Sequence, residues 1–322
     1  MDIKQFIEQK LNDLKTTEKV VDFASEKDLA DFIFKSVMSK KFRKFSVTPE
    51  YIKHINWAIE NSVKNKLPIK FVLPFGGYKL WRLEEAPEVD WAELFTLMYY
   101  ARWLKPIAEV YKPGVWFDFC SDDIIVERMN NISKNDTESY AKSFHLVLSF
   151  LENYLPENIE FTLTPISSLY TSEEFEVDLR DKVIKMEKEL GGFPILDEKR
   201  KKRVELNVKL KPNQDNDPLW REKVELLHQA YYTIDRRVFY RNAKEKIIAF
   251  STKMKDSVSV GTTKTSVVKF WVGVGALKKI DDGFIEYVLS PSQLESSNFI
   301  KENISIDGLE SKNFKTIRLF ND

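Results

Sequence analysis

Residues 74–79 form the first stretch whose residue types could bind a ligand. Gly76 and Gly77 let backbone N–H groups approach a bound molecule closely, and Lys79 adds a positive charge suited to a phosphate or a carboxylate. The stretch follows a hydrophobic run, so we expect it at the end of a buried strand. A plain turn is an equally good interpretation, because the G-x-G-x-x-G pattern of dinucleotide-binding loops is absent.

Two adjacent acids mark a second stretch, Ser121-Asp122-Asp123, which also follows a hydrophobic run. We expect Ser121 or Asp122 to cap the next helix, because free N–H groups and the helix dipole favour such side chains there. The remaining acid is then available to bind a metal, a ribose hydroxyl or an amine, or to act as a general base. This stretch is the strongest candidate for chemistry.

Two further cations could support anion binding. Lys264 lies in the polar run 261–266, which lacks the spacing of a phosphate-binding P-loop and which we interpret as a hairpin loop. Arg237 lies with two other arginines at the end of a predicted helix, where cations are favoured in any case. We interpret the dense charges of residues 197–210 as a solvated helix face, with a phosphate-binding patch as the alternative.

Composition narrows the class of protein. The chain has 322 residues, 43% of them apolar, and its 50 Lys and Arg balance its 50 Asp and Glu. That balance does not suit a general nucleic-acid binder, and no run reaches the roughly 18 apolar residues of a membrane span. The single cysteine, Cys120, excludes an internal disulfide, and with three histidines beside it no Cys/His zinc site is expected. We predict a cytoplasmic protein that acts on small molecules, without nucleic-acid or membrane partners.

The elements that would position the candidate residues alternate between strand and helix. Strands are predicted at 69–74, 115–120 and 159–163, with helices starting near residues 90 and 136 between them. Connections of helix length favour parallel strands in a Rossmann-like, doubly wound sheet. The loops after the three strands, 74–79, 121–123 and 164–168, would then meet at one edge, where ligands of open α/β sheets bind.

The pattern changes on both sides of this core. Helices are predicted at 3–15, 26–40, 48–66, 171–190, 197–210 and 219–240, and strands at 247–251, 267–274, 284–289 and, as a short edge strand, 314–319. We predict one α/β domain, with a mostly parallel sheet flanked by helices, N-terminal helices and a helical insertion. Its parts are the N-terminal helices (1–66), a βαβαβ core (67–168), a helical segment (169–241) and a β-rich C-terminal part (242–322). A split near residue 190 is the alternative.

The order of four short motifs resembles the isonitrile (isocyanide) synthase family. The motifs are Leu73-Pro74-Phe75 with Lys79, Ala86-Pro87-Glu88-x-x-Trp91-Ala92-Glu93, the run from Ile107 to Gly114, and Ser121-Asp122. They fall within residues 68–155. The chain departs from the family pattern in the inserted Gly76-Gly77-Tyr78, in Asp123 where the family has glycine, and in lacking a histidine in the strand near residues 247–253.

The resemblance implies a Rossmann-like fold and an enzyme of secondary metabolism. Such an enzyme converts the α-amine of an amino acid into an isonitrile, takes the carbon from ribulose 5-phosphate and needs no redox cofactor. We expect no metal ligands. The substrate-binding candidates are Gly76, Gly77, Lys79, Ser121, Arg237 and Lys264, and the candidates for catalytic proton transfer are Asp122, Asp123 and Glu93.

Two other functions fit the same residues. A nucleotide-sugar transferase would use Asp122 and Asp123 to hold a divalent metal through oxygen ligands. A non-catalytic binding protein would keep the fold without the reaction, and the absent C-terminal histidine motivates this alternative.

Overall fold

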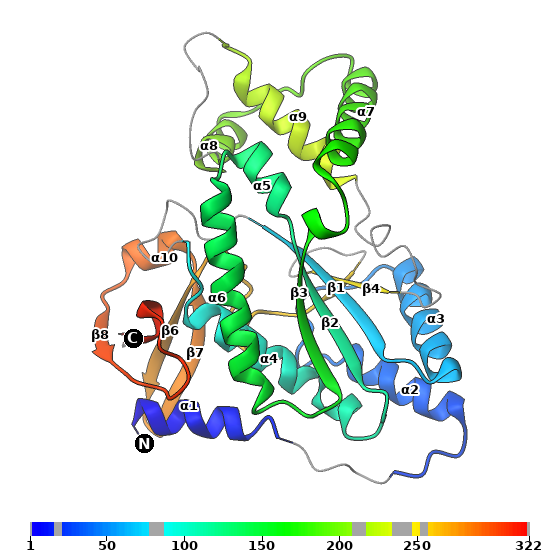
Figure 1. Cartoon of the computed structure of the whole chain (residues 1–322), viewed down its shortest axis with the longest axis vertical. Helices are drawn as coiled ribbons and strands as arrows, with labels where there is room; N and C mark the ends of the chain where they lie inside the picture. Colours follow the sequence, from blue (N-terminus) through cyan, green and yellow to red (C-terminus); the bar gives the residue numbers. More distant parts are fainter. Residues whose placement is uncertain are drawn as a thin grey trace.

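A five-stranded parallel sheet forms the centre of the molecule (Figure 1). The computed structural model describes residues 2–15, 21–76, 87–207, 217–233, 247–251 and 257–320. The strands are β1 (Ile69–Phe75), β2 (Val115–Ser121), β3 (Ile159–Pro165), β4 (Ile248–Ser251) and β5 (Val258–Ser259), in the order β3-β2-β1-β4-β5. Each neighbouring pair of these strands is parallel. The predicted Rossmann-like α/β class is confirmed.

Helices connect the first three strands, as the spacing of the sequence predicted. α4 (Trp91–Ala108) precedes β2, and α6 (Lys134–Glu152) precedes β3. α4 begins with a capping box in which the side chains of Asp90 and Glu93 accept hydrogen bonds from free N–H groups. A further helix, α5 (Asp123–Asn130), follows β2 directly. We did not predict α5, because eight residues give too short a periodic pattern.

The strand order brings two distant parts of the chain side by side. β1 pairs with β2 on one side and with β4 on the other, although residues 76–247 separate β1 from β4 in the sequence. This is the strand order of a doubly wound sheet, and β1 and β4 flank its switch point. Ligands of such sheets bind outside the carboxyl ends of the strands at that point.

The remaining helices form an N-terminal group and a middle group. The N-terminal helices are α1 (Ile3–Asn12), α2 (Glu26–Val37) and α3 (Pro49–Asn65), and the middle helices are α7 (Ser172–Leu190), α8 (Glu198–Asn207) and α9 (Trp220–Tyr232). Figure 1 shows the middle group next to α5, beyond the carboxyl ends of β1, β2 and β3. The helix predicted at 171–190 is confirmed as α7, which begins with a capping box between Thr171 and Glu174 and ends at Gly191. The rest of the helix predicted at 219–240 lies outside the described residues.

A second sheet forms most of the C-terminal part. Its strands are β6 (Val274–Ile280), β7 (Gly283–Leu289), β8 (Ile300–Asn303) and β9 (Thr316–Phe320), in the order β7-β6-β9-β8, with α10 (Pro291–Ser296) between β7 and β8. The start of α4 packs against its backbone, because a Cβ added to Gly275 would lie 2.3 Å from the Cβ of Trp91. The second sheet is thereby tied to the central helix of the parallel sheet.

Three C-terminal predictions are wrong. The strand predicted at 267–274 begins only at Val274, and the residues before it form turns. The run 261–266 is not a hairpin loop, because it connects β5 of the parallel sheet to the second sheet. β9, predicted at 314–319, is not an edge strand, since it lies between β6 and β8. Each error concerns pairing between distant segments, which the local pattern does not report.

Hydrophobic clusters cover both faces of the parallel sheet. The larger one packs α1 to α4, α6 and the second sheet against the face that carries Phe71 and Phe117. The smaller one packs α5, α7 and α9 against the face that carries Val72 and Cys120. Within the described ranges, no helix is both long enough and apolar enough to cross a membrane. The single-domain organisation, and the alternative split near residue 190, stay predictions.

Tyr100 on α4 provides a test of this core. Its ring packs against Phe117, Phe119 and Phe250, and its fully buried hydroxyl has no hydrogen-bond partner among the described residues. A buried polar group without a partner destabilises the fold by about 1–3 kcal/mol. We therefore expect Tyr100→Phe to raise the free energy of unfolding by about 1 kcal/mol in urea denaturation. A fall in stability would contradict the contacts described here.

The same variant has an expected pH signature. Burial raises the pKa of Tyr100 well above its usual value near 10, so the folded protein keeps this phenol neutral where the unfolded chain ionises it. The raised pKa of Tyr100 therefore does not affect the free energy of unfolding below about pH 10, and it lowers that free energy as the pH rises further. Melting curves of Tyr100→Phe should accordingly lose less stability above about pH 10 than those of the parent protein.

Candidate functional site

The first three strands of the parallel sheet end at one level. Phe75 lies opposite Ser121, and Ser121 lies opposite Pro165 in the parallel registers. One residue further, the backbone N–H of Asp122 donates to the carbonyl oxygen of Phe75 at 2.7 Å. The loops after β1, β2 and β3 therefore begin side by side, as the sequence predicted.

Gly76, the first residue after β1, lies directly against the start of α5. A Cβ added to Gly76 would lie 2.7 Å from Cγ1 of Val126 and 3.0 Å from the Cβ of Asp122. Any side chain at this position would therefore push α5 away from the sheet. The group that this glycine approaches is Asp122, whereas the sequence predicted the approach of a ligand, so the ligand-binding role of Gly76 stays a prediction.

Asp122 is the acid that faces this contact. The residue is 7% exposed, and it follows Ser121, which is 3% exposed at the end of β2. Asp122 occupies the N-cap position of α5, but its carboxylate does not cap the helix. The partial positive charge at a helix N-terminus stabilises a carboxylate in such a place. The arrangement suits a mostly buried acid that could accept a proton from a ligand held at the end of β1.

Asp123 has a different environment. Its carboxylate accepts hydrogen bonds from both the backbone N–H (3.1 Å) and the hydroxyl of Ser167, which belongs to the short 3₁₀ helix Ile166–Ser168 after β3. Asp123 thus holds the loop of β3 against α5. We expected Ser121 or Asp122 to take the structural role, whereas the contacts give it to Asp123. Its catalytic role stays a prediction.

Glu93 is fully buried at the start of α4. Its carboxylate accepts from the backbone N–H of Asp90 (2.9 Å) and from the hydroxyl of Tyr140 on α6 (2.9 Å). The Tyr140 ring packs against Phe75, with 6.1 Å between ring centroids, so one aromatic ring separates Glu93 from the end of β1. The catalytic role expected for Glu93 also stays a prediction, and its contacts favour a structural one.

Phe75 anchors an aromatic cluster beneath the site. The ring centroids of Phe270 and Trp271 each lie 5.5 Å from that of Phe75, and that of Phe144 lies 5.8 Å away. Sequence reasoning missed Phe270 and Trp271 because it placed them on a strand. The available signal in the sequence was Gly273, because a glycine within a predicted strand often marks a place where another part of the chain approaches the backbone closely. In the structure, a Cβ added to Gly273 would lie 2.6 Å from a side-chain carbon of Val288.

Lys264 lies on the other side of the switch point from Asp122. It is exposed in the turn that follows β5, and β4 lies between β5 and β1. Adjacent strands are about 4.8 Å apart, so the ends of β1 and β5 are separated by roughly 10 Å. The structure therefore brings Gly76, Ser121 and Asp122 together and holds Lys264 apart from them along the same edge.

Three candidates, Gly77, Lys79 and Arg237, lie outside the described residues. Among the residues that are described, no group of three or more His, Cys, Asp or Glu side chains could hold a metal ion. A metal site shared by Asp122 and Asp123 would also compete with the two hydrogen bonds from Ser167 to Asp123. These carboxylates therefore do not favour the alternative function, a nucleotide-sugar transferase that holds a divalent metal through Asp122 and Asp123.

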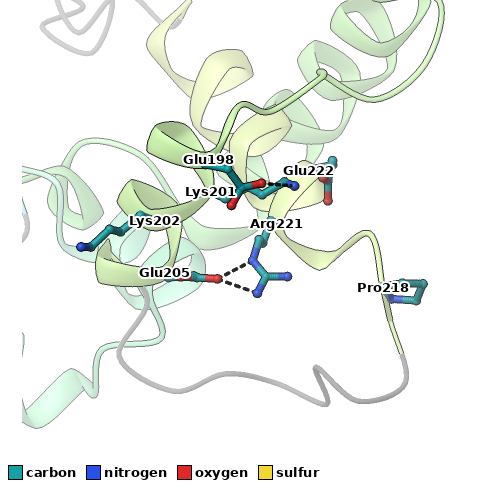
Figure 2. Close-up of a pocket in the computed structure, with 7 residues that line it drawn as sticks. All are labelled: Glu198, Lys201, Lys202, Glu205, Pro218, Arg221 and Glu222. Atoms are coloured by element: carbon teal, nitrogen blue, oxygen red, sulfur yellow. Dashed lines mark hydrogen bonds and ion pairs between the residues drawn. The ribbon is translucent and has the colours of Figure 1, made fainter.

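A hollow of about 560 Å³ lies between α8 and α9, far from these residues in the sequence (Figure 2). Its charged lining is largely paired: Arg221 donates to Glu205 at 2.6 Å, and Lys201 lies 2.8 Å from Glu198. These ion pairs agree with the interpretation of residues 197–210 as a solvated helix face. Because Arg221 and Lys201 are paired with carboxylates, the ion pairs do not favour the alternative interpretation as a phosphate-binding patch.

Comparison with known proteins identifies a solved structure with a similar fold. No family model matches the sequence, and no curated protein matches it significantly. The crystal structure of the PvcA protein from Pseudomonas aeruginosa is similar over 91% of this chain and 99% of that chain, with a TM-score of 0.59 and 16% sequence identity. The chain has the fold of the PvcA protein. The resemblance drawn from the motifs is thereby confirmed for the fold, and at this identity the match to PvcA extends no further.

Proposed function

We propose that the protein is an enzyme resembling the isonitrile synthases, which converts the α-amine of an amino acid into an isonitrile with a carbon from ribulose 5-phosphate. One observation carries the proposal. Phe75 and Asp122 come from two separate motifs of the family pattern, and a 2.7 Å hydrogen bond joins their backbones at the carboxyl ends of β1 and β2. The similarity to PvcA along nearly the whole chain supports it.

In this proposal the amine of the amino acid condenses with the carbonyl group of the pentose phosphate beside Gly76, which forms a C=N bond and releases the carbonyl oxygen as water. The amine must lose a proton before it can attack, and Asp122 is the acid placed to accept it. Ser121 lines the same strand end, and Glu93 holds α4 and α6 in position through Asp90 and Tyr140. The free thiol of Cys120 suits the reducing, cytoplasmic compartment that we propose.

The experiment supplies the purified protein with single amino acids and ribulose 5-phosphate and detects an isonitrile by mass spectrometry. With ribulose 5-phosphate labelled uniformly with ¹³C, the isonitrile should become one mass unit heavier, because one carbon is transferred. With a ¹⁵N-labelled amino acid it should gain one unit from nitrogen. The reaction without pentose phosphate is the control.

No consumption of ribulose 5-phosphate with any amino acid would overturn this proposal. A non-catalytic binding protein would then be the better interpretation, provided that ribulose 5-phosphate still binds. A nucleotide-sugar transferase would instead require Mn²⁺ or Mg²⁺ together with a nucleotide sugar, which calorimetry detects directly.

A further inference from the structure

A closed polar turn follows β5 on the β4 side of the switch point. Within residues 261–266, the N–H of Thr262 donates to the carbonyl oxygen of Ser266 at 3.1 Å, and the hydroxyl of Thr263 accepts from the N–H groups of Thr265 and Ser266. The hydroxyl of Ser266 accepts from the N–H of Val288 on β7. The turn is therefore fixed between the two sheets.

Two lysines meet at this turn. The ammonium group of Lys44 donates to the backbone carbonyl oxygen of Lys264 at 2.7 Å. Burial and the neighbouring charge of Lys264 both lower the pKa of Lys44, with burial the larger cause. Neither lysine forms an ion pair with a carboxylate among the described residues. Because the charge of Lys264 acts on Lys44 and no acid pairs with either lysine in the described part of the chain, the turn carries a positive potential that an anion would neutralise.

The turn also carries hydrogen-bonding groups that its own fold does not use. The hydroxyls of Ser259 and Thr262 are fully buried and have no partner in the described part of the chain. The backbone N–H of Lys264 donates to none of the described residues. Natural structures pair the great majority of buried hydroxyls, so the Thr262 hydroxyl in the turn and the Ser259 hydroxyl at the end of β5 call for a partner that the described residues do not supply.

The chemistry of these groups selects one class of ligand. Ammonium groups, a backbone N–H and hydroxyls supply donors and positive charge, which together suit a phosphate monoester. The turn lies on the same carboxyl edge of the sheet as Gly76, which contacts Asp122, and roughly 10 Å along that edge from the end of β1. One extended pentose phosphate could therefore place its carbonyl end near Asp122 and its phosphate at the turn after β5, across the switch point where ligands of this fold bind.

We propose that Lys44, Lys264 and the hydroxyl of Thr262 hold the phosphate group of the sugar phosphate substrate. The identity of the substrate rests on the function proposed above, whereas the phosphate-binding turn does not. The main phosphate contacts then come from the turn after β5, whereas the sequence alone favoured Lys79. It also adds Lys44, which no motif in the sequence marked.

Calorimetric titration with ribulose 5-phosphate, inorganic phosphate and unphosphorylated ribulose tests the proposal. The parent protein should bind both phosphorylated probes and bind ribulose far more weakly. Lys44→Met and Thr262→Val should each weaken phosphate binding about tenfold, because each removes one direct contact. Lys41→Met is the matched control: Lys41 is exposed three residues away and lies over the Phe42 ring, so its loss should leave binding unchanged.

Thr262→Val also separates ligand binding from folding. Valine has nearly the shape of threonine, and the Thr262 hydroxyl has no described partner, so the ligand-free variant should melt at the same or a higher temperature than the parent. Weaker phosphate binding in a protein that is not destabilised would support the proposal. Parent-like phosphate binding by Lys44→Met or by Thr262→Val would overturn it, as would a parent protein that binds no phosphate.

The two proposals can fail separately. If the parent protein makes an isonitrile while Lys44→Met and Thr262→Val bind phosphate normally, only the phosphate-binding turn is refuted. If the variants lose phosphate affinity while the parent makes no isonitrile from any amino acid, the turn is supported and the proposed reaction is refuted.

Discussion

Asp122→Asn is expected to lower the rate of isonitrile formation about 100-fold or more without destabilising the protein. Asparagine keeps the size of the side chain, so the contact with Gly76 survives. It cannot accept a proton, however, and general acid–base catalysis contributes about 10²–10⁴-fold to such reactions. Steady-state product formation measures the rate, and a melting curve of the same preparation checks the fold.

Asp123→Asn is the matched comparison, because it changes the neighbouring acid in the same way. Both carboxylate oxygens of Asp123 accept hydrogen bonds from Ser167, so we expect a looser loop after β3 and a much smaller loss of rate. Ser167→Ala should reproduce that effect. If Asp123→Asn abolished the reaction while Asp122→Asn left it intact, the roles assigned to the two acids would have to be exchanged.

Glu93→Ala is expected to lower the free energy of unfolding by about 3 kcal/mol. The change removes the acceptor for the N–H of Asp90 at the start of α4 and leaves the buried hydroxyl of Tyr140 without its partner. Both groups are buried, so water cannot replace the lost hydrogen bonds. Urea denaturation measures the difference.

The variant Glu93→Gln tests whether Glu93 has a structural or a catalytic role. Glutamine can still accept from Asp90 or Tyr140, so the variant should retain most of the stability and, if Glu93 is structural, most of the activity. Tyr140→Phe removes the hydroxyl that donates to Glu93 and should lower the free energy of unfolding by about 1 kcal/mol. Tyr100→Phe, by contrast, should raise the free energy of unfolding. A well-folded Glu93→Gln protein without activity would show that Glu93 acts in catalysis.

Local signals were enough to predict the first half of the parallel sheet. The hydrophobic runs that end at Phe75 and Ser121 mark strands, and the helix-length connections between them set their direction. Hence the meeting of Gly76 and Asp122 at one edge could be predicted, because it follows from strand direction alone. The capping boxes of α4 and α7 were equally predictable, because each depends on residues three positions apart.

What the sequence did not reveal depends on long-range pairing. The strand at 247–251 was predicted, but nothing near it indicates that it lies beside β1. The role of Asp123 depends on Ser167, which belongs to the loop of another strand. Lys44 reaches the turn after β5 only because residue 43 bridges to Val260. No periodicity or motif encodes these contacts, so they became visible only in the folded chain.

The position of β1 between β2 and β4 has a consequence for the synthesis of the protein. Three strands can pair as soon as β3 has left the ribosome, but the second edge of β1 stays open until residues 248–251 have been made. At 5–20 residues per second, the interval between the completion of β1 and the arrival of β4 lasts roughly 9 to 35 seconds. An open edge of apolar strand residues is a template for aggregation during that time. Nascent chains that stop before residue 248 would therefore lack both β4 and the proposed phosphate-binding turn, and would expose the edge of β1 to chaperones.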